Sequence, residues 1–124
     1  MTDQINPAHY RAHPAFGIEC YELTRFMDFT TGNACKYLWR SGRKGDAVED
    51  LRKAHWYLEQ LPSPNISIIP QQLVDIVAAQ ARGFLEDRES DVEWLTVAAI
   101  LHLILDDRET ARDMVQTAIQ KENC

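Results

Sequence analysis

The sequence predicts an all-α fold, a compact helical bundle of about five to six helices. Three observations lead to this prediction: apolar residues recur with helical spacing, no period-two run typical of a strand is present, and proline or glycine residues separate the segments. A length of 124 residues suits one shared core. We expect residues 1–61 to form one helical region and residues 62–124 a second region that packs on it and serves oligomerisation.

The first half is expected to hold an extended arm and then three helices. The arm covers residues 1–16, which contain two prolines and show no periodicity. The helices are predicted over about residues 18–28, 31–43 and 46–61. The second of them carries an apolar stripe of Ala34, Cys35, Leu38, Trp39 and Gly42.

Capping signals place several helix ends. Gly45 is expected to end the helix over 31–43, and the capping box Asp46-x-x-Glu49 to open the next one. In the same way Ser90-x-x-Glu93 forms a capping box that opens a later helix.

The second half is expected to begin with a linker over residues 62–69 that lies against the body. Pro70 then suits the first turn of a helix that ends near Gly83. The helix over 91–106 is apolar nearly all round, which indicates a central helix or one buried in a homo-oligomer. A last amphipathic helix over 109–121 presents Ala111, Met114, Val115, Ala118 and Ile119 on one side.

Cysteine usage and hydropathy indicate the compartment. The three cysteines form no C-x-x-C pair and no signal peptide precedes them, so a disulfide framework is not expected. The longest apolar stretch, residues 97–105, is far shorter than the roughly 20 residues of a membrane span. We expect a protein of a reducing cytoplasm with no membrane partner.

The charge is unevenly distributed along the chain. The net charge is −6, yet the first half balances eight basic against eight acidic residues, while the second half has five against eleven. Six basic residues fall within 18 positions: Lys36, Arg40, Arg43, Lys44, Arg52 and Lys53. An acidic chain with one basic patch suggests a small anionic partner, and no duplex nucleic acid is expected.

The helix over 31–43 separates a polar face from its apolar stripe. Asn33 can hydrogen-bond a base or ribose, and Tyr37 can stack or donate its hydroxyl. Lys36 and Arg40 can neutralise phosphate oxygens. The alternative is an ordinary solvated face of charged residues.

The next helix repeats this separation. Lys53, Trp56 and Tyr57 lie near one face with Glu49, which is placed to pair with Lys53. Val48, Leu51, His55 and Leu58 can point inward. The alternative use of Trp56 and Tyr57 is packing between helices.

Other candidate sites receive less support. Arg43-Lys44-Gly45 resembles a phosphate nest, although a glycine-ended helix with basic residues explains it as well. The spacing of His9, His13, Cys20 and Cys35 matches no closed zinc site. Carboxylates that could hold magnesium are equally ordinary surface acids, and no metal site is predicted; they are Glu19, Glu22, Glu49 and Asp50. No P-loop and no G-x-G-x-x-G fingerprint is present.

Several motifs in order resemble a known family. They are His9-Tyr10, Gly17-Ile18-Glu19-Cys20, Gly32-Asn33-Ala34-Cys35-Lys36-Tyr37-Leu38-Trp39-Arg40 and Glu49-Asp50-Leu51-Arg52-Lys53-Ala54-x-Trp56-Tyr57-Leu58. Residues 6–61 resemble the SaV-like phage domain, a family of unknown function that is similar to a phage nucleotide kinase without a Walker motif. The resemblance implies a nucleotide site, with ATP and Mg as cofactors if the protein is a kinase. The predicted ligand-binding residues are His9, Tyr10, Glu19, Asn33, Lys36, Tyr37, Arg40, Lys53 and Trp56.

Three functions are compatible with these observations. The first is a nucleotide-binding phage or prophage protein, including a nucleoside monophosphate kinase that lacks a P-loop and whose catalytic residues are unassigned. The second is a non-catalytic module that sequesters a nucleotide signal. The third is a helical interaction protein.

Overall fold

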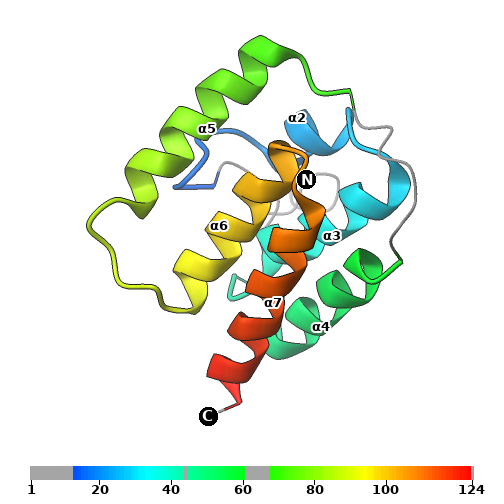
Figure 1. The fold of residues 1–124 in the computed structure, drawn as a ribbon, viewed down its shortest axis with the longest axis vertical. Coiled ribbons are helices and arrows are strands. Elements are labelled where there is room, and N and C mark those ends of the chain that lie inside the picture. Colours follow the sequence, from blue (N-terminus) through cyan, green and yellow to red (C-terminus); the bar gives the residue numbers. More distant parts are fainter. Residues whose placement is uncertain (1–12, 44, 61–67, 124) are drawn as a thin grey trace, which may run out of the picture.

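The computed structural model describes residues 13–43, 45–60 and 68–123, and this part of the chain folds into helices and connecting turns without a strand (Figure 1). Its helices are α2 (Cys20–Thr24), α3 (Phe29–Arg40), α4 (Ala47–Leu58), α5 (Gln71–Leu85), α6 (Val92–Ile104) and α7 (Arg108–Glu122). The predicted all-α bundle is confirmed. None of these helices is both long enough and apolar enough to cross a membrane.

The first segment differs from its prediction in two ways. Residues 13–18 form a tight turn, in which the backbone N–H of Gly17 donates to the carbonyl of His13 at 2.7 Å, so the end of the expected extended arm is folded. The rest of that arm, residues 1–12, lies outside the described residues. The helix expected over 18–28 is only five residues long, because Asp28 caps a new helix by accepting from the backbone N–H of Thr31 at 2.8 Å.

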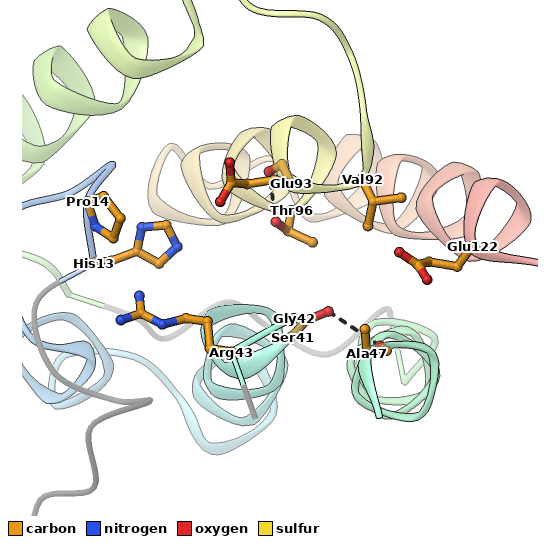
Figure 2. Close-up of a pocket in the computed structure, with 10 residues that line it drawn as sticks. All are labelled: His13, Pro14, Ser41, Gly42, Arg43, Ala47, Val92, Glu93, Thr96 and Glu122. Atoms are coloured by element: carbon orange, nitrogen blue, oxygen red, sulfur yellow. Dashed lines mark hydrogen bonds between the residues drawn. The ribbon is translucent and has the colours of Figure 1, made fainter. Parts of the chain in front are cut away.

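Helix α3 ends earlier than the sequence predicted, before the turn that joins it to α4. The helix stops at Arg40, and Gly42 rather than Gly45 follows its end, with a φ of 78° that favours glycine. The hydroxyl of Ser41 donates to the carbonyl of Ala47 at 3.3 Å and ties the two helices together (Figure 2). Asp46 caps α4 as predicted. In the predicted stripe, Gly42 is exposed and lies outside the helix, while the other members are buried.

Two boundary predictions in the second half are wrong by a few residues. Gly83 lies inside α5, because the helix continues until Phe84 and Leu85 pack against the core. The N-cap of α6 is Asp91 rather than Ser90, and its carboxylate accepts from the backbone N–H of Trp94 at 2.9 Å. The predicted apolar face of α7 is confirmed, with Met114 half-buried and the others buried.

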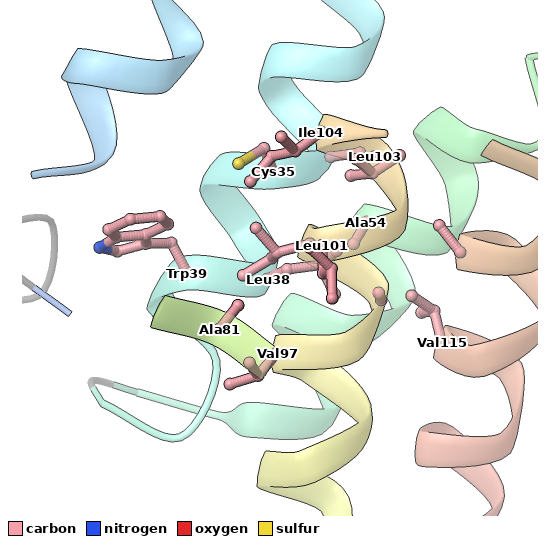
Figure 3. Close-up of a cluster of buried hydrophobic side chains, with 14 of the residues drawn as sticks. Cys35, Leu38, Trp39, Ala54, Ala81, Val97, Leu101, Leu103, Ile104 and Val115 are labelled. Atoms are coloured by element: carbon pink, nitrogen blue, oxygen red, sulfur yellow. The ribbon is translucent and has the colours of Figure 1, made fainter. Parts of the chain in front are cut away.

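Helix α6 lies at the centre of the bundle. It runs between α5 on one side and α3 and α7 on the other, and α4 packs against α3 and α7 (Figure 1). Its buried residues include Val97, Leu101 and Ile104, which meet Leu38 and Trp39 of α3 in the same apolar cluster (Figure 3). The predicted central position is confirmed, and neighbours in the same chain cover this helix. Oligomerisation stays a prediction.

The linker predicted to lie against the body is described only at its end. Residues 61–67 lie outside the described residues. The backbone N–H of Ile68 donates to the carbonyl of Phe26 at 2.8 Å, so this end of the linker contacts the turn between α2 and α3.

Candidate functional site

The polar face of α3 lies at the border between the core and the solvent. Asn33, Lys36, Tyr37 and Arg40 are all half-buried, while the opposite stripe of the helix is fully buried. The separation of two faces that the sequence predicted is therefore present. The four side chains share this face because positions three and four apart lie above one another on a helix.

The ring of Tyr37 is the centre of a group that joins α3 to α4. The ammonium of Lys36 lies 4.8 Å from the centroid of this ring, and that of Lys53 lies 5.4 Å from it. Tyr57 of α4 stacks on Tyr37 with centroids 6.1 Å apart and planes 14° from parallel. The structure thus brings together Lys36, Tyr37 and Lys53, three of the predicted ligand-binding residues.

Exposed aromatic rings extend this group. The ring of Tyr57 has edge-to-face contacts with Trp56 at 5.1 Å and with Phe29 at 6.4 Å. Phe29 is 78% exposed and Trp56 is 57% exposed. We call the six residues the aromatic–lysine cluster: Phe29, Lys36, Tyr37, Lys53, Trp56 and Tyr57. Phe29 was missed as a site residue, although its position as the first apolar residue after the Asp28 cap could have marked it as exposed.

Lys53 keeps its positive charge in this setting. Its ammonium lies 2.9 Å from the carboxylate of Glu49, one turn earlier on α4, so the predicted pair is confirmed. Hydrogen bonding to Glu49 raises the pKa of Lys53. The cluster therefore presents a permanent cation that already has an anionic neighbour.

Arg40 is held differently from the two lysines. Its Nε lies 3.4 Å from the Oδ2 of Asp50, whose side chain is almost completely buried between α3 and α4. Burial raises the pKa of Asp50, and the nearby guanidinium of Arg40 opposes this shift. The structure therefore assigns Asp50 a packing and pairing position, where the sequence suggested an ordinary surface acid. A carboxylate in the first turn of a helix gives no sign in the sequence that it faces inward.

Of the remaining predicted ligand residues, Glu19 lies apart from this cluster, and two others lie outside the residues that the structure describes. Glu19 is the N-cap residue of α2 and takes part in a capping box with Glu22, whose carboxylate accepts from the backbone N–H of Glu19 at 2.8 Å. This explains both carboxylates by local helix structure. His9 and Tyr10 lie outside the described residues.

Cys20 and Cys35 are buried thiols of the core. A hydrogen bond with Cys20 and burial both raise the pKa of Cys35, which keeps it in its unreactive thiol form. Within the part of the chain that the structure describes, no three histidine, cysteine or acidic residues gather as a metal site would require.

Comparisons with known proteins place the cluster within a recognised segment. Residues 5–59 match the model of a protein family of unknown function, DUF3310. No curated protein and no solved structure matches the chain, so the resemblance to SaV-like phage domains and to a nucleotide kinase stays a prediction.

The segment that matches this family model contains α2, α3 and α4, and therefore the whole aromatic–lysine cluster. Helices α5, α6 and α7 follow it in the chain and supply the layer on which α3 and α4 pack. The candidate surface thus belongs to the matched segment, while the support beneath it comes largely from outside that segment.

Proposed function

We propose that the aromatic–lysine cluster binds a nucleotide, in a protein of phage or prophage origin that acts in the host cytoplasm. The observation that carries the proposal is the ring of Tyr37, which has Lys36 and Lys53 within 5.4 Å and Tyr57 stacked on it. Aromatic rings stack on bases, and ammonium groups neutralise phosphates. The order of the motifs, which resembles SaV-like domains, supports the same class of ligand.

The exposure of the outer rings gives further support. Phe29 and Trp56 leave large apolar surfaces in water. Such exposed apolar groups beside polar ones are typical of binding surfaces. A base that stacks on either ring would remove this surface from water while its phosphate reaches Lys36 or Lys53.

Binding fits the geometry better than a complete catalytic site. Phosphoryl transfer depends on positioned cations and exclusion of water around the transferred group. Here Lys53 and Arg40 already pair with Glu49 and Asp50, and the outer rings lie open to solvent. We therefore propose nucleotide binding as the function. Turnover of the bound nucleotide would add kinase activity to it, and that activity would require ATP and Mg.

Calorimetry with deoxynucleoside monophosphates and ATP, with and without Mg²⁺, tests the proposal. We expect binding of at least one nucleotide, weakened by about 1–3 kcal/mol in Trp56→Ala if a base stacks on this ring. Lys36→Gln should weaken binding about tenfold or more, because a charge-assisted contact is lost.

Two controls separate a site from general effects. Lys121→Gln removes the same charge from the exposed last turn of α7, and Ile76→Ala removes an exposed apolar side chain from α5. Neither should change the affinity. The proposal is wrong if no nucleotide binds, or if the controls weaken binding as much as the cluster variants do. Appearance of a nucleoside diphosphate product in the same mixtures would establish kinase activity.

A further inference from the structure

A cavity lies at the other end of the α3–α4 pair from the aromatic–lysine cluster. It is a cavity of about 270 Å³ between the turn that joins α3 to α4, the turn at His13, the first turns of α6 and the end of α7 (Figure 2). We call it the His13 cavity. Its volume is several times the share of one water molecule, which is about 30 Å³. The polar residues of its wall are His13, Ser41, Arg43, Glu93, Thr96 and Glu122.

The imidazole of His13 is fixed in the wall of this cavity. The residue is only 6% exposed, and its ring packs edge-to-face against Phe16 at 5.3 Å, Trp39 at 5.2 Å and Phe84 at 6.5 Å. The backbone N–H of Ala15 donates to its Nδ1 at 3.0 Å. The ring therefore cannot turn without losing a hydrogen bond and three aromatic contacts.

This hydrogen bond determines where the proton of the ring lies. A backbone N–H can only donate, so Nδ1 must be the unprotonated acceptor, and the neutral ring carries its proton on Nε2. Burial, and then the charge of Arg43, lower the pKa of His13 to about 4, which keeps the ring neutral near pH 7. Among the described residues, none accepts a hydrogen bond from Nε2.

The other polar groups make the two ends of the cavity chemically different. Arg43 lies on the wall next to His13 and adds a guanidinium with several donors, as Figure 2 shows. Val92 and Glu93 in the first turn of α6, and Ala47 in the first turn of α4, line the same space, where helix dipoles favour a negative group. The carboxylate of Glu93 pairs with Arg88 at 3.7 Å, and Glu122 lies at the opposite end beside Ala47.

We propose that the His13 cavity binds a small phosphate- or carboxylate-bearing molecule, whose anionic oxygens accept hydrogen bonds from Nε2 of His13 and from Arg43. A fixed, neutral N–H beside a guanidinium suits an oxygen acceptor and disfavours a cation. The carboxylate of Glu122 at the other end suits hydroxyl or amino groups on the rest of the ligand. This site is separate from the aromatic–lysine cluster, and it combines residues of the segment that matches the family model with residues that lie outside it.

Nitrogen-detected NMR of the histidine side chains in the full-length protein tests the proposal directly. The titrants are inorganic phosphate, acetate and ribose 5-phosphate, so that a bare phosphate, a bare carboxylate and a hydroxylated phosphate are compared. We expect the Nε2–H signal of His13 to shift and saturate with phosphate, and to saturate at a lower concentration with ribose 5-phosphate. Saturation with acetate alone would instead assign the site to carboxylates within the same proposal.

Matched arginine variants show whether the effect is local. Arg43→Gln should raise the dissociation constant about tenfold or more, because a charge-assisted hydrogen bond is lost. Arg82→Gln removes the same charge from an exposed position on α5 and should leave the constant unchanged. Arg43 is exposed, so its replacement should not prevent folding, and the dispersion of the NMR spectrum checks this.

Three results would overturn the proposal. One is that none of the titrants shifts the His13 signal in a saturable way. Another is that Arg82→Gln weakens the response as much as Arg43→Gln does, which would show only a general effect of charge. The third is a proton on Nδ1 instead of Nε2, because the cavity would then lack its fixed donor. None of these results bears on nucleotide binding at the cluster.

Discussion

The aromatic–lysine cluster and the His13 cavity lie at different places on the same α3–α4 pair and are built in opposite ways. The cluster is an open surface of exposed rings and long lysine side chains, all carried by two neighbouring helices. The cavity is more enclosed, and its key donor is a buried ring held by a hydrogen bond and three aromatic contacts. The comparison shows that exposed surfaces can be inferred from local helical spacing, whereas a rigid cavity depends on long-range packing.

The largest expected effect comes from a tryptophan that supports the cavity. Trp39 is completely buried and contacts the ring of His13, so Trp39→Ala should reduce the free energy of unfolding by about 3–5 kcal/mol. The matched change Trp56→Ala removes a ring that is 57% exposed and should cost less than about 1 kcal/mol. Urea unfolding of both variants measures the difference. Equal losses would show that the two regions are not built as differently as we infer.

The next effect concerns the pH dependence of stability. His13 has a pKa of about 4 in the folded protein and 6.5 as its ordinary value. As the pH falls, the unfolded chain therefore takes up this proton before the folded protein does. The contribution of His13 to the free energy of unfolding is complete above about pH 6.5 and is lost as the pH falls toward 4. Its size is about 3 kcal/mol. Arg43, Glu93 and Glu122 are the charged residues of the same cavity wall.

Urea unfolding of the native protein and of His13→Gln between about pH 7.5 and pH 4 isolates this contribution. Carboxylates elsewhere titrate equally in both proteins, so the difference between the two curves belongs to His13. We expect the native protein to lose more stability than the variant over this range. Parallel curves would mean that the imidazole is accessible to protons in the folded state, and the contrast between a rigid and an open site would fail.

The smallest effect belongs to the ion pair of the cluster. Lys53 and Glu49 are 2.9 Å apart but both are well exposed, so solvent screens their attraction. We expect Lys53→Gln and Glu49→Gln, alone and combined, to leave the midpoint of urea unfolding unchanged within error at physiological salt. A clear coupling in this double-mutant cycle would show that the pair is a structural element of the surface and not a charge available to a ligand.

Much of the fold and most of the candidate surface follow from spacing along single helices. The stripe of Ala34, Leu38 and Trp39 predicted the buried face of α3, and the opposite face correctly grouped Lys36 with Tyr37. Helix ends were less accurate where a neighbouring residue competed for the same role, as Asp91 did with Ser90.

The parts that could not be predicted depend on which groups meet in space. Asp50 lies in a first turn rich in acidic residues, and only the packing of α3 on α4 turns it inward toward Arg40. The His13 cavity draws its wall from the turn at His13, from residues 41–43 and Ala47, from α6 and from the end of α7. No local pattern connects segments so far apart in the sequence.

The central position of α6 has a consequence for the segment that contains α2, α3 and α4. The inner faces of α3 and α4 are covered by α6 and α7, which lie outside residues 5–59. A chain that ended after α4 would expose Leu38, Leu51 and Leu58 to water, and would lose much of the stabilisation that burial provides. Any protein that carries α2 to α4 alone must therefore recruit a substitute helical layer, from its own later residues or from a second molecule.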